Sequence, residues 1–232
     1  YPDLLGFSKE IKAPEVAGCR VGKELKKALA DHGWKNKMNV LLLNDTVAAL
    51  LAGAAAPDEG MKYSSYIGFI LGTGMNGAYI QPEDAAYKGL KRQIVVCESG
   101  KFDKVARSDF DEAFDAKSVK PGTSRMEKMC SGAYLGPVSF EMIQSSLVAQ
   151  KLLEIKEMTL IEMDAFLHSP YSTASVLGAK AAGCATKEDY DRLFQILDAL
   201  VERCARLATS ILAACVIKSG AGTSSDEPVC IL

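Results

Sequence analysis

Residues that could act on a substrate occur at three places in this chain of 232 residues, and the first is Asn44-Asp45-Thr46. These residues follow the apolar run of 39–43 and precede a run of small, helix-forming residues. In α/β proteins, chemistry is placed where strands end and helices begin, so a carboxylate here could accept a proton. Asp45 could equally cap the helix that follows, and the local sequence leaves both interpretations open.

The second place is Gly72-Thr73-Gly74, which separates two apolar, β-prone runs within residues 63–81. This spacing predicts a β-hairpin with a glycine-dependent turn. The same residues could instead form a loop whose backbone N–H groups and threonine hydroxyl bind phosphate oxygens. The loop is not of the Walker A type, because no Gly-Lys-Ser/Thr follows it.

Two glutamates make up the third group. Glu98 ends the apolar run that begins at Ile94, and Glu127 lies in a predicted helix over Arg125–Leu135. By themselves they could be a loop carboxylate and a solvated helix charge. With Asp45 and the glycine loop, however, they form an ordered set rather than isolated matches.

The elements that must position these residues include a βα unit. Periodicity, glycine and proline predict a helix at Val21–His32, a strand at Met38–Leu43 and a helix at Thr46–Ala56. The hairpin and a strand from Ile94 follow. The later helices, which we expect to serve packing, are predicted at Asp109–Phe114, Arg125–Leu135, Pro137–Leu153 and, as one or two helices, within Thr186–Ala214.

The composition and net charge bear on which partners the chain could bind by electrostatic attraction. Hydrophobic residues make up 48% and charged residues 24%, which is typical of a globular chain with one large domain or a domain with an appendage. The formal net charge of −2 offers no electrostatic basis for binding nucleic acid or an anionic membrane. No apolar run is long enough for a membrane span, and no signal peptide opens the chain.

The seven cysteines are scattered, form no Cys-x-x-Cys pair and are accompanied by two histidines. This pattern indicates reduced thiols in a cytoplasmic protein and predicts neither a disulfide framework nor a metal site. The chain opens with Tyr1 rather than Met and stops inside a strand predicted to begin at "VCIL". We therefore expect it to be an internal piece of a longer protein.

Four segments, taken in order, resemble motifs of the hexokinase family, the ATP-dependent hexose kinases of the actin-like fold. They are "LLLNDTVAAL", "GFILGTGMNGAYI", "CESGKF" and "PGTSRMEKMCSGAYLG", and the resemblance extends from about Ser8 to Leu232. It implies an α/β fold, the actin-like or ribonuclease H-like large domain of a hexokinase, with a mixed sheet and many packing helices. It also implies that residues 1–44 are the C-terminal remnant of a small domain and 45–232 a large domain truncated before the adenosine-binding motif.

Carried over position by position, the resemblance implies a base, a sugar-binding group and a phosphate loop. Asp45 would accept the proton of the sugar's C6 hydroxyl as it attacks the γ-phosphate. The implied cofactors are ATP and Mg²⁺, the implied partner is a hexose such as glucose, and no protein metal ligands are implied. The hexose would bind Asn44, Asn76, Glu98 and Glu127, with Ser8 and Lys9 reaching it from the smaller domain, and the ATP phosphates would bind Gly72, Thr73 and Gly74.

The chain also departs from the family pattern. No first phosphate loop of the type Asp-(Leu/Phe)-Gly-Gly-Thr-Asn occurs, Ser99 replaces a usual Trp, and 163–168 lack a threonine that would help to hold ATP. The implied activity is phosphorylation of a hexose, the first step of glycolysis, and we expect residues 1–232 by themselves to be inactive. The alternative is a hexose-binding sensor or regulator of the same fold that has lost transfer.

Overall fold

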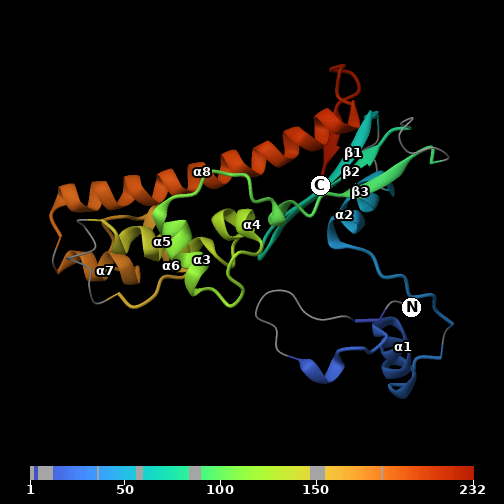
Figure 1. The fold of residues 1–232 in the computed structure, drawn as a ribbon, viewed down its shortest axis with the longest axis horizontal. Helices are drawn as coiled ribbons and strands as arrows, with labels where there is room; N and C mark the ends of the chain where they lie inside the picture. The colour runs from blue at the N-terminus through green and yellow to red at the C-terminus, as the bar shows by residue number, and fades with distance from the viewer. Residues whose placement is uncertain are drawn as a thin grey trace. The chain divides into compact units, whose positions relative to one another are not determined.

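The computed structural model describes residues 3–4, 13–35, 37–55, 60–83, 90–146, 155–183 and 185–232. The chain separates into two compact units, Tyr1–Asn44 and Asp45–Leu232, and Figure 1 shows the elements of each.

The first unit contains a short 3-10 helix, η1 (Pro14–Val16), and the helix α1 (Val21–Asp31). The helix predicted at Val21–His32 is therefore confirmed. It ends before Gly33, whose φ of +84° is a conformation that glycine adopts without strain.

The strand predicted at Met38–Leu43 is wrong. These residues form neither helix nor strand, and Leu41 and Leu43 are exposed, with relative accessibilities of 78% and 47%. An apolar run becomes a strand only when a neighbouring strand pairs with its backbone groups. None of the strands in the described part of the chain pairs with this run, so the expected βα unit is reduced to its helix.

The second unit is built on a four-stranded sheet. Its strands are β1 (Ser65–Leu71), β2 (Met75–Gln81), β3 (Gln93–Val96) and β4 (Val229–Ile231), in the order β3-β2-β1-β4. The neighbours are antiparallel except for β1 and β4, which are parallel. This confirms the predicted hairpin, the strand from Ile94, the strand at 229–232 and the mixed character of the sheet.

Helices pack against both faces of the sheet, and glycines allow their close approach. Gly68 of β1 lies against the backbone of Thr46 in α2 (Asp45–Ala55), while a Cβ on Gly77 of β2 would lie 3.3 Å from Ile211 of α8 (Lys187–Ser219). Side chains alternate between the faces of a strand. Gly68 and Gly77 therefore mark opposite faces, one covered by α2 and the other by α8.

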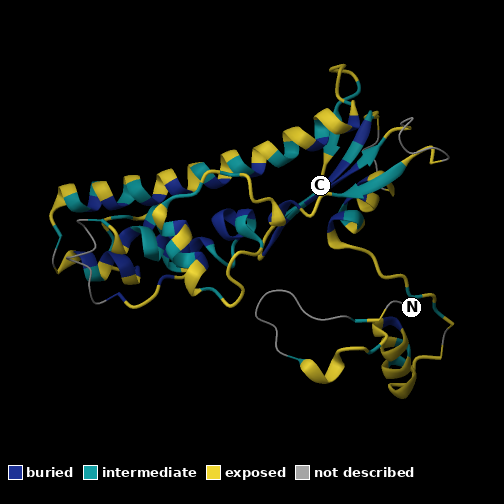
Figure 2. Ribbon diagram, in the orientation of Figure 1, coloured by how far each residue is buried: buried dark blue, intermediate teal, exposed yellow. Residues whose placement is uncertain are grey.

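The remaining helices form a second packing group beside the sheet. They are α3 (Asp109–Lys117), α4 (Arg125–Cys130), α5 (Leu135–Gln144), α6 (Leu160–His168) and α7 (Val176–Ala182). The buried face of α8 packs against this group. It includes Leu193, Leu197 and Leu200, whose spacing places them on one side of the helix. Figure 2 shows this buried face in dark blue on the inner side of α8, whose outer side is exposed.

Several predicted helices differ in length from those observed. The helix expected at Asp109–Phe114 continues to Lys117. The helix expected over Arg125–Leu135 ends at Cys130, and a break at 131–134 separates α4 from α5. The helix expected over Pro137–Leu153 ends at Gln144, and 147–154 lie outside the described residues. The segment Thr186–Ala214 forms one helix that continues to Ser219.

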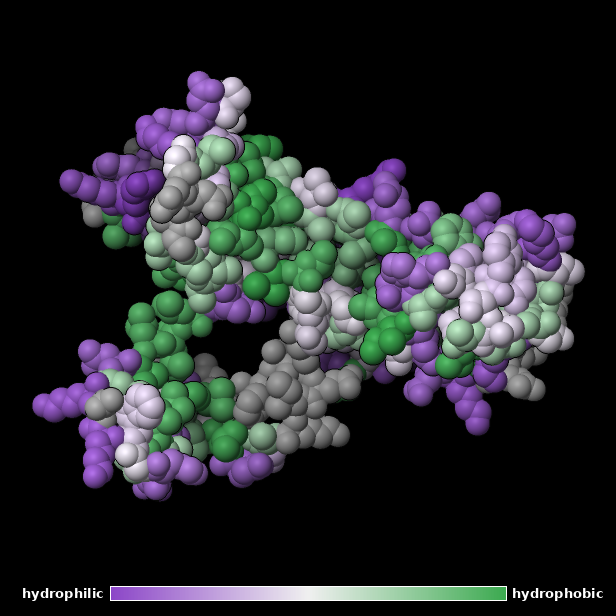
Figure 3. Space-filling model, turned by 180° about the vertical axis from the view of Figure 1, so that it is seen from behind, coloured by the Kyte–Doolittle hydropathy of each residue, from purple (hydrophilic) through white to green (hydrophobic). Residues whose placement is uncertain are grey.

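No helix among the described residues is long and apolar enough to cross a membrane. On the face drawn in Figure 3, hydrophilic residues are interspersed with apolar ones over the second unit.

Candidate functional site

The tip of the β1–β2 hairpin is bound to the break between α4 and α5. Within the tip, the N–H of Gly72 donates to the carbonyl of Gly74 (2.9 Å). Across the contact, the N–H of Gly132 donates to the carbonyl of Gly72 (2.7 Å), and that of Ala133 to the carbonyl of Thr73 (3.4 Å). A Cβ on Gly132 would lie 3.0 Å from the Gly72 oxygen, so a glycine is needed for this approach.

A cavity of about 890 Å³ opens beside this tip and is lined by Gly72, Thr73, Gly132 and Ala133. Its other walls are mainly apolar and come from α3, α5 and residues 156–161. Two lysines and two glutamates also line it, Lys117, Lys156, Glu141 and Glu157, and Lys117 is paired with Glu141 at 2.7 Å. A volume of this size suits a small-molecule ligand or cofactor. The predicted phosphate-binding loop therefore lies at the wall of a cavity as well as forming a turn.

Asn76 and Glu127, which are far apart in the sequence, are brought together at the start of β2. The Glu127 carboxylate accepts the N–H of Met75 (3.0 Å). The Asn76 side-chain oxygen accepts the N–H groups of Gly77 (2.8 Å) and Ser99 (3.3 Å). These bonds orient a carboxylate and an amide, which are the groups that pair well with hydroxyls.

Glu98 joins this group through the short helix η3 (Ser99–Lys101). A Cβ on Gly100 would lie 3.0 Å from the Cβ of Glu127, so η3 packs directly on α4. Glu98 itself has a φ of +50°, in the left-handed region that costs free energy for a residue with a Cβ. Its half-exposed carboxylate pairs with Lys101 at 2.8 Å. Such local strain is found most often at functional sites.

Asp45 is the first residue of α2 and is exposed. Its carboxylate accepts the N–H of the buried Thr46 at 2.9 Å, which orients the side chain at the helix start. Ile70 pairs with Asn76 and Gly68 with Ala78 in the sheet, so Asn76 lies on the face that α2 covers. The helix that begins with Asp45 therefore covers the face of the sheet that carries Asn76.

Three other predicted sugar contacts belong to the first unit. Asn44 is its last residue and directly precedes Asp45. Ser8 and Lys9 lie outside the described residues.

A thiol pair lies next to Glu98. Cys97 is exposed, and its sulfur lies 3.7 Å from that of Cys215 on α8. The hydrogen bond from Cys215 lowers the pKa of Cys97 more than partial burial raises it. The hydrogen bond with Cys97 and burial both raise the pKa of Cys215. The described cysteines are all free, and among the described residues no group of three metal-ligating side chains occurs.

Sequence reasoning missed Lys128, a buried charge adjacent to Glu127. The available signal was its position in the short helix, where Glu127 and Lys128 together interrupt the apolar residues Met126 and Met129-Cys130.

Comparison with known proteins gives one consistent result. The family model described as hexokinase matches residues 66–231. Hexokinase-5 of Oryza sativa subsp. japonica is 30% identical over 229 residues, 89% of this chain and 44% of that protein. Glucokinase-1 of Kluyveromyces lactis is 29% identical over 252 residues, 94% of this chain and 52% of that protein. The chain spans about half the length of the curated relatives it matches.

Solved structures show the same fold. A hexokinase from Schistosoma mansoni complexed with glucose matches with a TM-score of 0.73 and 22% identity, over 99% of this chain and 62% of that one. A second hexokinase crystal structure matches with a TM-score of 0.67 and 26% identity, over 93% and 50%. This likeness confirms the expected actin-like α/β fold with a mixed sheet and many packing helices.

Proposed function

This chain belongs to the hexokinase family, and from that premise we propose that the protein containing it transfers the γ-phosphate of ATP to the C6 hydroxyl of a hexose such as glucose. The observation that carries the proposal is the convergence of Asn76, Glu98 and Glu127 around η3. The same hairpin that begins β2 with Asn76 carries the glycine loop at its tip.

The hexose would be bound by hydroxyl-pairing groups. A sugar ring carries hydroxyls that both donate and accept, and carboxylates with amides pair with adjacent hydroxyls in a fixed orientation. Asn76, Glu98 and Glu127 supply these groups in the second unit. The resemblance also assigns hexose contacts to Asn44, Ser8 and Lys9, and Ser8 and Lys9 lie outside the described residues. A site built in this way rejects a sugar that lacks a hydroxyl, because its own polar groups would stay unpaired.

The nucleotide would occupy the cavity of about 890 Å³ beside Gly72, Thr73 and Gly74. The glycine loop with its threonine hydroxyl fits phosphate oxygens. The other walls carry two lysines and two glutamates, and Lys117 is paired with Glu141, so the loop rather than net charge would bind the phosphates. Mg²⁺ would be bound largely by the phosphates of the nucleotide and by water. When bound, it would neutralise charge on the phosphates.

Phosphoryl transfer needs positioning and a group that takes the hydroxyl proton. Asp45 would take the proton from the C6 hydroxyl, with its carboxylate oriented by the N–H of Thr46. The hairpin tip, held by its bonds to Gly132 and Ala133, would keep the terminal phosphate in place for in-line attack.

The domain assignment is part of the proposal. Residues 1–44 would be the end of the small domain and 45–232 most of the large one, and the division of the chain between Asn44 and Asp45 supports this. The free cysteines support a cytoplasmic location, where thiols stay reduced and where the first step of glycolysis takes place.

An Asp45→Asn variant of the whole protein tests the assignment of the base. We expect its kcat for glucose phosphorylation to fall by a factor of about 100 or more, because proton acceptance is lost. The dissociation constant for glucose, measured by calorimetry, should change little. The matched control is Asp198→Asn, at an exposed position on α8.

Full turnover by Asp45→Asn would contradict the role of Asp45. A wild-type protein that binds glucose but forms no ADP from ATP would instead favour the alternative, a hexose-binding sensor that has lost phosphoryl transfer. No feature of the described residues supports this sensor over the kinase.

A further inference from the structure

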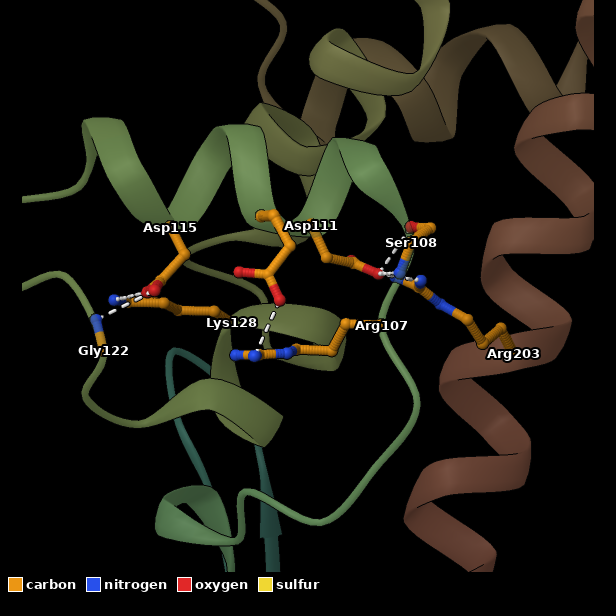
Figure 4. Close-up of polar contacts among 8 residues, drawn as sticks. Arg107, Ser108, Asp111, Asp115, Gly122, Lys128 and Arg203 are labelled. Carbon is orange, nitrogen blue, oxygen red and sulfur yellow. Dashed lines mark hydrogen bonds and ion pairs between the residues drawn. The ribbon is translucent and has the colours of Figure 1, made fainter.

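Lys128 is a buried charge that the proposed mechanism does not use. Its side chain is 7% exposed, and its ammonium donates to the Asp115 carboxylate, to the Ser118 hydroxyl (2.8 Å) and to the Lys120 carbonyl (2.8 Å). An ammonium has three N–H groups, so all of them are paired. Figure 4 shows Lys128 of α4 extending toward Asp115 of α3.

Asp115 ties this contact to the loop between the two helices. Its second oxygen accepts the N–H of Gly122 at 2.8 Å. Burial raises the pKa of Asp115, but the bonds from Lys128 and Gly122 lower it further, so the net shift is downward. Lys128 and Asp115 therefore form a charged pair, and the α3–α4 loop folds around the Lys128 ammonium.

The helix α4, which carries Glu127, is not stable without contacts to other elements. α4 has six residues, its N-cap Ser124 has a φ of +49°, and no side chain caps its first turn. Helices this short are not stable without tertiary contacts. The orientation of the Glu127 carboxylate therefore depends on what anchors α4.

A second, partly buried ion pair holds α4 at Met129, the residue after Lys128. Arg203 of α8 donates to both oxygens of Asp111 in α3 (2.7 and 2.9 Å) and to the carbonyl of Met129 (3.3 Å). Asp111 also accepts the N–H and hydroxyl of Ser108 (Figure 4). α4 is thus held by charged contacts at Lys128 and at Met129, the two residues that follow Glu127.

We propose that Lys128 is a positioning residue for the hexose, holding α4 against Asp115 so that the Glu127 carboxylate faces the sugar. This inference rests on the proposed function. Buried ion pairs often contribute less to stability than an apolar pair of the same size, so the charge is better explained by the orientation it imposes. Lys128 acts through Glu127 and touches no substrate itself.

The test is a double-mutant cycle in the whole protein. Lys128→Met leaves Asp115 buried and unpaired, so the main variant is Lys128→Met with Asp115→Leu, which removes both charges and keeps the packing. We expect it to raise the KM for glucose about tenfold and to leave the KM for ATP within about twofold. In a Glu127→Gln background the same pair of changes should raise the glucose KM less than about twofold, because Lys128 then positions a residue that is already altered.

Lys187→Met is the matched control, since Lys187 forms an exposed pair with Asp191 on α8. It should leave both KM values unchanged. A native glucose KM in the Lys128→Met/Asp115→Leu variant, or an equal effect with and without Glu127→Gln, would overturn the inference. A wild-type protein that phosphorylates no hexose would refute the proposed function instead. The glucose affinities of the same variants, measured by calorimetry, would then still test the positioning role of Lys128.

Discussion

Glu98 and Ser124 are the residues other than glycine that have a positive φ in the described part of the chain. Glu98 begins η3, and Ser124 begins the helix that carries Glu127. Both strained residues therefore border the candidate sugar site. Strain of this kind persists only where the surroundings enforce it, and a carboxylate that must face a ligand is a reason to keep it.

Replacement of Glu98 separates strain from binding. Glu98→Gly should raise the free energy of unfolding by about 1 kcal/mol relative to Glu98→Ala, because glycine adopts φ of +50° without the Cβ clash. Both variants lose the exposed pair with Lys101 and the carboxylate. Both should therefore bind glucose more weakly.

Urea unfolding and calorimetry with glucose measure the two effects. Equal stability of the two Glu98 variants would refute the strain, and native glucose affinity in either would remove Glu98 from the site.

At the scale of elements, the second unit depends on contacts between short pieces. η3 and α4 are too short to be stable alone, and each is fixed by residues from elsewhere in the chain. The Glu127–Met75 bond joins α4 to the sheet, and the Lys128–Asp115 pair joins α4 to α3. The position of the Glu127 carboxylate is thus set by contacts of α4 with the sheet and with α3.

The pair between α3 and α4 predicts how stability depends on pH. The pKa of Asp115 is lower in the folded protein than its ordinary value of 3.8, since the bonds from Lys128 and Gly122 outweigh burial. The folded state therefore binds fewer protons there than the unfolded state. Its contribution to stability is present above pH of about 4 and is lost as the pH falls through the folded pKa.

Asp115→Asn should remove this dependence. Between pH of about 4 and 2 its melting temperature should fall less steeply than that of the wild type, whereas the exposed Asp198→Asn should follow the wild-type curve. Parallel curves for wild type and Asp115→Asn would show that Asp115 titrates alike in the folded and unfolded states.

At the scale of the molecule, the chain spans about half the length of the hexokinases it matches. It contains the candidate phosphate loop at Gly72–Gly74 and the candidate sugar-binding carboxylates, while a first phosphate loop does not occur among its residues. Catalysis in such enzymes requires both reactants to be held in one geometry, with the charge of the phosphates neutralised.

Residues 1–232 by themselves should therefore form no glucose-dependent ADP above background. A coupled assay on the purified chain measures this, with circular dichroism to show that it is folded and with the whole protein as the positive control. Turnover by the chain alone would mean that the missing loop is dispensable.

The sequence by itself determined the local elements and the family. The helices at α1 and α2, the hairpin and the strand at β3 follow from periodicity and glycine placement, which depend on neighbours in the chain. The order of motifs around Asp45, Thr73, Glu98 and Glu127 was sufficient to identify a hexokinase-like chain. The roles of these residues remain proposals.

Only the tertiary structure decided which segments pair and which charges are buried. Met38–Leu43 looks like a strand but has no strand partner in the described part of the chain, and Lys128 looks like a surface charge but is enclosed. The contacts that matter join residues far apart, such as Glu127 with Met75 and Arg203 with Asp111. Strand pairing and burial are properties of such distant pairs, and local periodicity carries no information about them.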